Sequence, residues 1–148
     1  MLGFEIRRKY ASIVDDKLAS LGLGGRARVF SEDARQALPR LPAGSVARVY
    51  VHFPDPWWKK RHAKRLVVGV ALLPEVVRVL EAGGELFVQT DVEERALQYE
   101  QAIADTPGLV PVPGGPRVPE NPFSARSPRE HRAIKDGLPI YRLLYAKP

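Results

Sequence analysis

The sequence predicts an α/β fold with a mainly parallel sheet. Strand-like and helix-like segments alternate along the chain, and this alternation is typical of parallel strands joined by crossover helices. Hydrophobic residues make up 45% and charged residues 27% of the 148 positions, a balance typical of one globular domain. We therefore expect a single domain over residues 1–148.

The first third of the chain predicts three strands and two helices. The first helix is indicated by apolar residues at steps of three and four, and a cluster of glycines directly follows it. The expected elements are a strand at Leu2–Ile6, a helix at Tyr10–Leu21, a strand at Arg26–Phe30, a short helix at Ala34–Leu38 and a strand at Ala47–Phe53.

The remainder predicts two more helices and two more strands. A helix is expected from Lys64 to Leu80, with Pro74 as a kink site and Gly83-Gly84 as the terminator. Residues 107–128 are rich in proline and glycine and predict a long loop. The other expected elements are a strand at Glu85–Thr90, a helix at Val92–Ala104 and a last strand at Ile140–Ala146.

The most distinctive segment follows the third expected strand. It is Phe53-Pro54-Asp55-Pro56-Trp57-Trp58-Lys59-Lys60-Arg61-His62-Ala63-Lys64-Arg65. Because a residue before proline avoids the α region, Phe53 and Asp55 are both expected to be extended. Asp55 is then a carboxylate on a stiffened loop at the carboxyl end of a strand, where open α/β sheets bind ligands. A turn-forming Asp at a rigid strand exit is the alternative.

Positive charge is concentrated in the same segment. The chain has 23 lysines and arginines against 17 acids, and five of these cations lie between residues 59 and 65. The remaining 18 nearly balance the acids. Beside two indoles, this patch indicates a polyanionic partner that stacks on aromatic rings and is bound through its phosphates. A solvated helix face would explain the charge run equally well.

Composition also argues against several classes of protein. The chain has no cysteine and only three histidines, so we expect no disulfide and no metal site. The N-terminal residues lack the apolar region of a signal peptide, and no run approaches the ~20 apolar residues of a membrane span. We expect a cytoplasmic protein without membrane contact.

The distinctive segment resembles the signature of the tRNA (guanine-N7-)-methyltransferase family, Phe-Pro-Asp-Pro-Trp-x-Lys-x-Arg-His-x-Lys-Arg. The similarity extends to the C-terminal residues. It implies a Rossmann-like class I fold that binds S-adenosylmethionine (SAM), with a mostly parallel sheet and an antiparallel last strand. The implied reaction is methyl transfer from SAM to N7 of guanine 46 in the variable loop of tRNA.

The resemblance also implies three cofactor-binding residues. Glu5 matches the acid that binds the ribose hydroxyls of SAM, and Asp33 matches an acid near the adenine. Asp55 matches the catalytic residue, which lies close to both the methyl donor and the target base. From the residues alone, Glu5 would be an exposed acid at a strand end and Asp33 a helix N-cap.

Residues that bind the tRNA substrate are implied in three further places. Lys59 matches a tRNA contact, and Asp91 matches an acid at the exit of the next strand, although an N-cap would explain it too. A Thr-x-x-Glu motif of the family corresponds to Ser127, Pro128, Arg129 and Glu130. Serine replaces threonine there, and a capping box would explain Ser127 and Glu130 equally well.

The family has one segment that this sequence does not match, a first strand followed by a glycine-rich turn. We therefore expect the chain to begin at the family's second strand, without a strand that is central in the sheet. Two alternatives remain open: a non-catalytic RNA-binding fragment of the same family, and another SAM enzyme such as an amino-group methyltransferase. An unrelated α/β protein with a basic face is the least favoured.

The absent strand leads to a stability prediction. Without a central strand, two rows of backbone hydrogen-bonding groups lose their partners, so we expect a poorly stable chain or loss of tight SAM binding. Thermal melting with and without SAM tests this. A cooperative transition that SAM shifts upward would contradict it.

Overall fold

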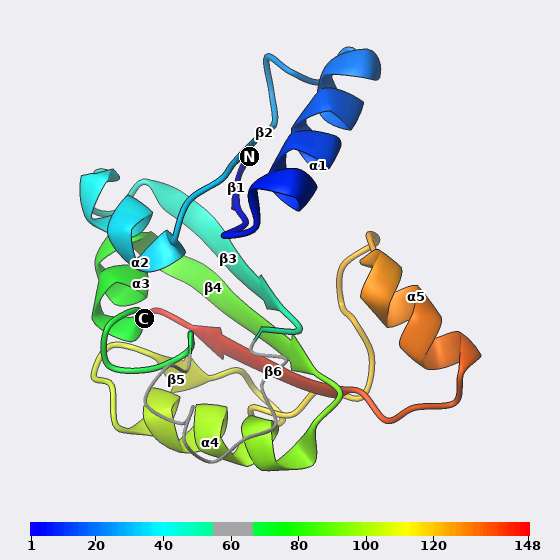
Figure 1. Cartoon of the computed structure of the whole chain (residues 1–148). Coiled ribbons are helices and arrows are strands. Elements are labelled where there is room, and N and C mark those ends of the chain that lie inside the picture. Colours follow the sequence, from blue (N-terminus) through cyan, green and yellow to red (C-terminus); the bar gives the residue numbers. More distant parts are fainter. Residues whose placement is uncertain (55–66) are drawn as a thin grey trace. The chain divides into compact units, whose positions relative to one another are not determined.

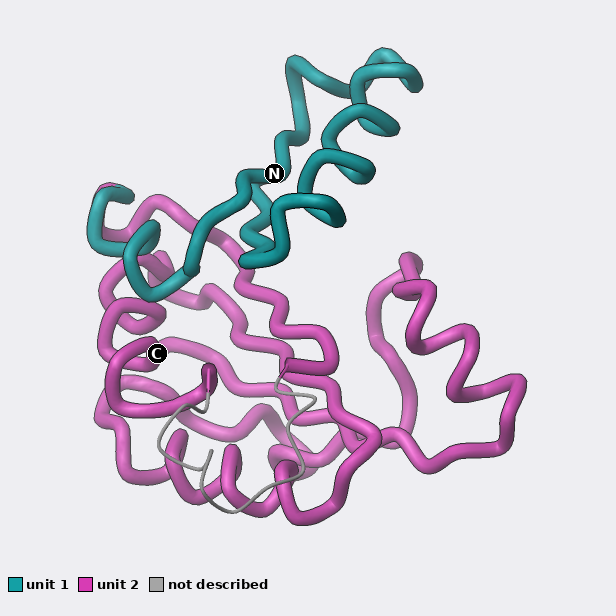
Figure 2. The backbone as a smooth tube through the Cα atoms, in the orientation of Figure 1, with its two compact units in different colours: residues 1–41 teal, residues 42–148 magenta. Residues whose placement is uncertain are grey.

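The computed structural model describes residues 1–54 and 67–148, which form two compact units, residues 1–41 and residues 42–148 (Figures 1 and 2). The expectation of one domain over the whole chain stays a prediction.

The first unit is a strand–helix–strand motif followed by two short helical turns. Strands β1 (Leu2–Phe4) and β2 (Arg28–Phe30) are parallel and are joined by helix α1 (Arg8–Ser20). The carboxylate of Asp15 on α1 accepts the backbone N–H of Val29 at 2.8 Å and fixes the helix beside β2. Helix α2 (Ala34–Ala37) and the 3-10 turn η1 (Leu38–Arg40) follow.

The second unit contains a four-stranded mixed sheet in the order β3-β4-β6-β5. Its strands are β3 (Val46–His52), β4 (Leu80–Thr90), β5 (Val110–Pro111) and β6 (Tyr141–Ala146). β3 and β4 are parallel, whereas β6 is antiparallel to both β4 and β5. The expected direction of the last strand is therefore confirmed, and the other three strands all run opposite to it.

The core of this unit is centred on β4. Leu86, Phe87 and Val88 are all buried, so both faces of the strand are covered. Helices α3 (Leu73–Val79) and α4 (Glu93–Ala104) pack against β4. They contribute buried apolar side chains at helical spacing, Leu73, Val76, Val79, Ala96, Tyr99 and Ile103. A third helix, α5 (Pro128–Lys135), precedes β6.

The expected helix from Lys64 to Leu80 is confirmed over Leu73–Val79 and wrong over residues 67–72. Residues 67–72 are not helical, and residues 64–66 lie outside the described residues. α3 begins only at Leu73, so Pro74 occupies the first turn, where its missing N–H breaks no hydrogen bond, rather than a kink. Lys147 closes the other end of α3, because its ammonium donates to the carbonyls of Val77 and Leu80 at 2.8 and 2.7 Å.

Gly83 and Gly84 lie within β4 and do not terminate a helix. The pairing of β3 with β4 jumps from Val46↔Leu80 to Arg48↔Glu85, and the two glycines fall in this irregularity. Gly83 has a φ of 77°, and a Cβ on Gly84 would lie 2.9 Å from the carbonyl oxygen of Glu81. Both positions therefore suit only glycine.

Two elements follow residue 107 that the sequence pattern did not indicate. β5 adds two residues to the sheet inside the expected loop, and α5 starts at the last residue of that loop. Within the same loop, the side chain of Asn121 accepts the N–H of Phe123 at 2.9 Å. This turn places the Phe123 ring 5.1 Å from the rings of Tyr50 and Phe87, so the loop covers one face of the sheet.

Replacement of Gly84 by alanine should destabilise the second unit. The new methyl group meets backbone atoms that cannot rotate away, so we expect Gly84→Ala to lower the free energy of unfolding by roughly 1–3 kcal/mol. Urea denaturation measures this. Gly25→Ala is the matched control, because nothing lies within 4 Å of its Cβ position. Equal stability of the two variants would contradict the close approach.

Candidate functional site

The exit from β3 is the part of the distinctive segment that the structure describes. Phe53 has a φ of 47°, which makes it the single non-glycine residue with positive φ among residues 1–54 and 67–148. The expected extended conformation of Phe53 is therefore wrong. Its N–H bonds the carbonyl of Gln89 at 2.8 Å, so the chain turns sharply while still attached to β4. Backbone strain of this kind concentrates at functional sites.

Asp55 and Lys59, the predicted catalytic residue and the first predicted tRNA contact, lie outside the described residues. The structure shows only the residues that lead into this segment, up to Pro54. Phe53 and Pro54 lie after the carboxyl end of β3, beside the carboxyl end of the parallel strand β4. Open α/β sheets bind ligands at this edge.

A row of three polar side chains crosses the sheet at the same edge. His52 on β3 pairs in register with Gln89 on β4, and Gln89 pairs with Arg142 on β6. Directly paired residues project to the same face of a sheet. Although β4 is otherwise apolar here, Gln89 is fully buried. A buried amide in a hydrophobic strand needs polar partners.

Glu130 on α5 supplies a partner to two members of this row. Its buried carboxylate accepts hydrogen bonds from Arg142 Nη2 at 3.1 Å, Gln89 Nε2 at 3.2 Å and Asn121 Nδ2 at 3.0 Å. Burial opposes ionisation, but the hydrogen bonds, led by that of Arg142, outweigh it and lower the pKa of Glu130. The carboxylate is thus held ionised in the interior.

Two buried polar atoms of this network have no hydrogen-bond partner within the described part of the chain. They are Oε1 of Gln89, an acceptor, and Nε of Arg142, a donor. Such atoms are rare in native proteins because each forfeits the hydrogen bonds that water would give it. The network therefore retains capacity for a polar ligand.

The capping alternative holds for Ser127 and fails for Glu130. The Ser127 hydroxyl accepts the Glu130 N–H at 3.1 Å, as an N-cap does, and Pro128 occupies the first turn of α5. In a capping box the acid would return to the backbone N–H of Ser127. The Glu130 side chain instead points inward and accepts hydrogen bonds from Arg142, Gln89 and Asn121, so it joins α5 to the sheet and does not cap the helix.

Asp91 and Arg129 are brought together as an ion pair. The side chain of Asp91 is 15% exposed and that of Arg129 is 49% exposed. The pair joins the exit of β4 to the first turn of α5. Asp91 does not cap α4, because Val92 holds that position and its N–H bonds the hydroxyl of Thr90. The four predicted residues Asp91, Ser127, Arg129 and Glu130 therefore lie around one short helix end.

Glu5 and Asp33 both lie in the first unit, after neighbouring parallel strands. Glu5 follows β1 and accepts the Arg7 N–H at 2.8 Å and the Arg7 guanidinium at 3.0 Å. Partial burial opposes ionisation, but the hydrogen bonds to Arg7 lower the pKa of the Glu5 carboxyl. Asp33 caps α2 by accepting the Arg35 N–H at 2.9 Å, so the alternative prediction of a helix N-cap is confirmed for this residue.

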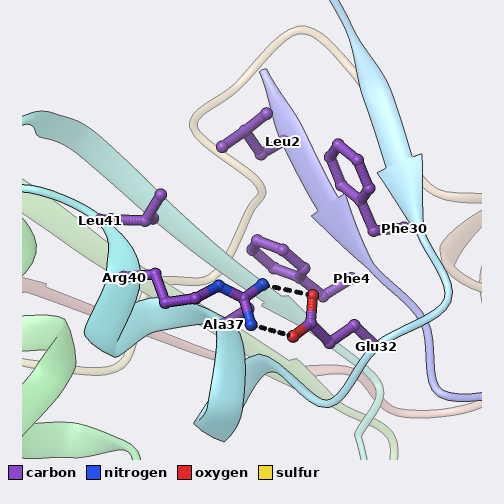
Figure 3. A pocket seen from close by; sticks show the side chains of 7 residues that line it. All are labelled: Leu2, Phe4, Phe30, Glu32, Ala37, Arg40 and Leu41. Carbon is purple, nitrogen blue, oxygen red and sulfur yellow. Dashed lines mark hydrogen bonds and ion pairs between the residues drawn. The ribbon is translucent and has the colours of Figure 1, made fainter.

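A small pocket lies in the first unit but does not include these two acids (Figure 3). Its volume is about 190 Å³, below the ~300 Å³ of ordinary ligand pockets. Aromatic and aliphatic side chains form most of the wall, and the Glu32–Arg40 ion pair, with N–O distances of 2.5 and 2.6 Å, crosses it. We assign no function to it.

Among the described residues no group of three metal-binding side chains occurs. Nor does any described helix have the length and apolarity needed to cross a bilayer.

Comparison with known proteins identifies the family of this chain. A family model described as "Putative methyltransferase" matches residues 1–143. A tRNA (guanine-N(7)-)-methyltransferase from Myxococcus xanthus is 38% identical, over 99% of this chain and 71% of its own length. A protein of the same name from Trichormus variabilis is 34% identical, over 99% of this chain and 69% of its own.

Solved structures agree on the fold. TrmN from Thermus thermophilus has a TM-score of 0.65 at 16% identity, over 99% of this chain and 36% of that one. Geranyl diphosphate methyltransferase in complex with SAM has a TM-score of 0.58 at 18% identity, over 99% of this chain and 67% of that one. The expected Rossmann-like class I SAM-dependent methyltransferase fold is thus confirmed. Because the family match extends over nearly the whole sequence, the chain belongs to the methyltransferase family that includes the tRNA (guanine-N7-)-methyltransferases.

Proposed function

We propose that this chain transfers a methyl group from SAM to N7 of a guanine in tRNA, with guanine 46 of the variable loop as the target and the cytoplasm as the place of action. The observation that supports this most directly is the buried, ionised Glu130 at the carboxyl end of β4. It lies beside a Gln89 oxygen that has no hydrogen-bond partner in the described part of the chain. Family membership supports the reaction itself.

The hydrogen-bonding groups of guanine explain why carboxylate and amide oxygens, which accept hydrogen bonds, are useful at this site. The Watson–Crick edge of guanine carries two donors, N1–H and the N2 amino group, whereas N7 lies on the opposite edge. A carboxylate and an amide oxygen can accept both donors. The side chains of Glu130 and Gln89 are fully buried in this structure, so in our proposal they hold this edge of the base only once the loop before α5 has opened. Arg142 orients Glu130, and N7 is left free. Asp91 and Arg129 border the site, and Ser127 and Pro128 set the start of α5.

N7 attacks without losing a proton, because its lone pair lies in the ring plane. The chain therefore needs no general base, and positioning should supply most of the rate enhancement. As transfer proceeds, positive charge develops on the purine. A fixed carboxylate such as Asp55 would complement that charge, and we assign it this role. Lys59 is proposed to contact tRNA phosphate.

The residues of the first unit fit a SAM site unequally. Glu5 suits the ribose hydroxyls, because it is ionised, partly exposed and located at the carboxyl end of β1. Asp33 suits the adenine less well, because it caps α2 and both of its oxygens bond Arg35 closely, whereas one oxygen of Glu5 has only a 3.4 Å bond to Arg7. When bound, SAM supplies an electrophilic methyl group. Arg7 and Arg35 would have to give up hydrogen bonds to their acids in that state.

A single-atom change in the substrate tests the reaction. We expect methyl transfer to a tRNA transcript with guanine at position 46, and none when 7-deazaguanine replaces it, since carbon at that position has no lone pair. Incorporation of labelled methyl groups, at SAM concentrations raised until the rate saturates, measures both. Equal labelling of the two transcripts would refute N7 as the acceptor.

An Asp55→Asn variant tests the role of this carboxylate in the same assay, with Asp105→Asn as its matched control. Loss of the fixed charge should lower kcat by roughly 100-fold, the scale expected for one electrostatic contact in a transition state. Within residues 1–54 and 67–148, the exposed side chain of Asp105 bonds only Gln101 of the preceding helix, so Asp105→Asn should keep normal turnover. Normal turnover in Asp55→Asn would remove this residue from the mechanism.

The ionised state of Glu130 makes stability depend on pH. Because its pKa is lowered in the folded chain, its contribution is complete above the unfolded value of about 4.3 and is lost as pH falls through the folded value. The stability difference between the wild type and Glu130→Gln should therefore be constant near neutral pH and shrink in acid. Urea denaturation at stepped pH measures it, with the exposed Glu81→Gln as control. A pH-independent difference would mean that Glu130 is not ionised.

A further inference from the structure

Residues 126–135 carry four cations and one acid. The cations are Arg126, Arg129, Arg132 and Lys135, all on exposed residues, and we call them the α5 cations. The acid is Glu130, which is fully buried. The exposed side of α5 therefore carries the positive charges and the buried side carries the negative charge, although Glu130 lies between the cations in the sequence.

The pairing of Glu130 explains this asymmetry. Its charge is compensated in the interior by Arg142, so it does not neutralise the cations outside. Asp136 is the nearest exposed acid, but its carboxylate is 3.9 Å from Arg132, and both groups are largely solvated. An exposed pair of this kind contributes ~0–1 kcal/mol. The outward face of α5 is therefore positive.

The helix dipole accounts for only part of the set. Arg132 and Lys135 lie in the last turn, where cations interact favourably with the carbonyl end of a helix. Arg126 precedes the N-cap Ser127, and Arg129 lies in the first turn, where the dipole disfavours positive charge. Arg129 is compensated by Asp91, whereas Arg126 has no hydrogen bond or ion pair with another residue in 1–54 or 67–148. A purely structural explanation therefore leaves Arg126 unexplained.

The location of α5 connects these cations to the site. The Arg129–Asp91 pair and the Glu130–Gln89 hydrogen bond attach its first turn to the carboxyl end of β4. Figure 1 shows α5 on the side of the sheet toward which the β3 and β4 arrows point. A nucleic acid that delivers a guanine to this edge would pass along the helix.

We propose that the α5 cations form a phosphate-binding surface for the tRNA backbone, in addition to any contacts made by the basic run at residues 59–65. The inference rests on the proposed function for the identity of the RNA. Lysine and arginine side chains on an exposed helix bind phosphate oxygens without reading sequence, and each contact releases condensed counterions. The surface therefore contributes affinity and orientation, not the choice of base.

The test removes three α5 cations and leaves the site residues intact. Arg126→Gln/Arg132→Gln/Lys135→Gln is compared with Arg8→Gln/Lys9→Gln/Lys17→Gln, which removes the same charge from exposed positions on α1. Fluorescence anisotropy gives the Kd for a tRNA transcript between about 50 and 200 mM salt. Loss of the three phosphate contacts should lower the slope of log Kd against log salt concentration by about 2.1 or more. Affinity at low salt should fall roughly tenfold. KM for tRNA should rise while kcat stays unchanged.

Equal urea midpoints for the wild type and both variants show that the fold is retained. A slope that drops only in the α5 variant supports the surface. An unchanged slope in that variant, or an equal drop in the α1 variant, overturns it. If the wild type methylates no tRNA and the α5-dependent slope persists, the proposed reaction fails while the RNA surface stands. If methylation occurs with an unchanged slope, the surface alone fails.

Discussion

A carboxylate that solvent does not reach determines how the larger unit is organised at its carboxyl-end edge. Moving a bare carboxylate into the interior would cost many kcal/mol, so Glu130 is tolerated only because three donors surround it. The donors come from β4, from the loop after β5 and from β6. Segments that are distant in sequence are thereby held together by one charge.

The same network also orders its surroundings. Arg142 donates to the carbonyl of Pro119 as well as to Glu130, and Asn121 donates to the carbonyl of Ala125 as well as to Glu130. The loop is thus fixed on both sides of Phe123, whose ring covers Tyr50 and Phe87. A proline- and glycine-rich segment gains a defined conformation from polar contacts, because it buries too few apolar side chains to order itself.

Periodicity in the sequence predicted most of the fold, and its failures have identifiable causes. The sequence pattern located eight of the strands and helices, which are β1, α1, β2, α2, β3, β4, α4 and β6. The helix expected from Lys64 to Leu80 was misjudged because Pro74 fits a first helical turn as well as a kink, and periodicity does not distinguish the two. α5 went unpredicted because it has few apolar residues, although its Ser-x-x-Glu start was visible.

The candidate site could be predicted only as far as local motifs allow. Family resemblance located Glu5, Asp33, Asp91 and the segment from Ser127 to Glu130. From the residues alone, Glu5 was an exposed acid, and Asp33 and Asp91 were helix caps. Gln89, Asn121 and Arg142 were missed, because their importance comes from cross-strand register and from a buried partner on another element. A glutamine within an otherwise apolar strand was the single available signal. The positive φ of Phe53 also depends on its hydrogen bond to β4, which no local rule contains.

The strand order has a consequence for how the larger unit assembles. β6 comes last in chain order, yet it lies between β4 and β5 in the sheet. Until Tyr141–Ala146 has left the ribosome, one whole edge of the buried strand β4 lacks its neighbour, and Glu130 lacks Arg142. Completion of the sheet must therefore wait until this segment has been synthesised. During that interval a nascent chain exposes an apolar strand edge, which is where chaperones or unwanted pairing would act.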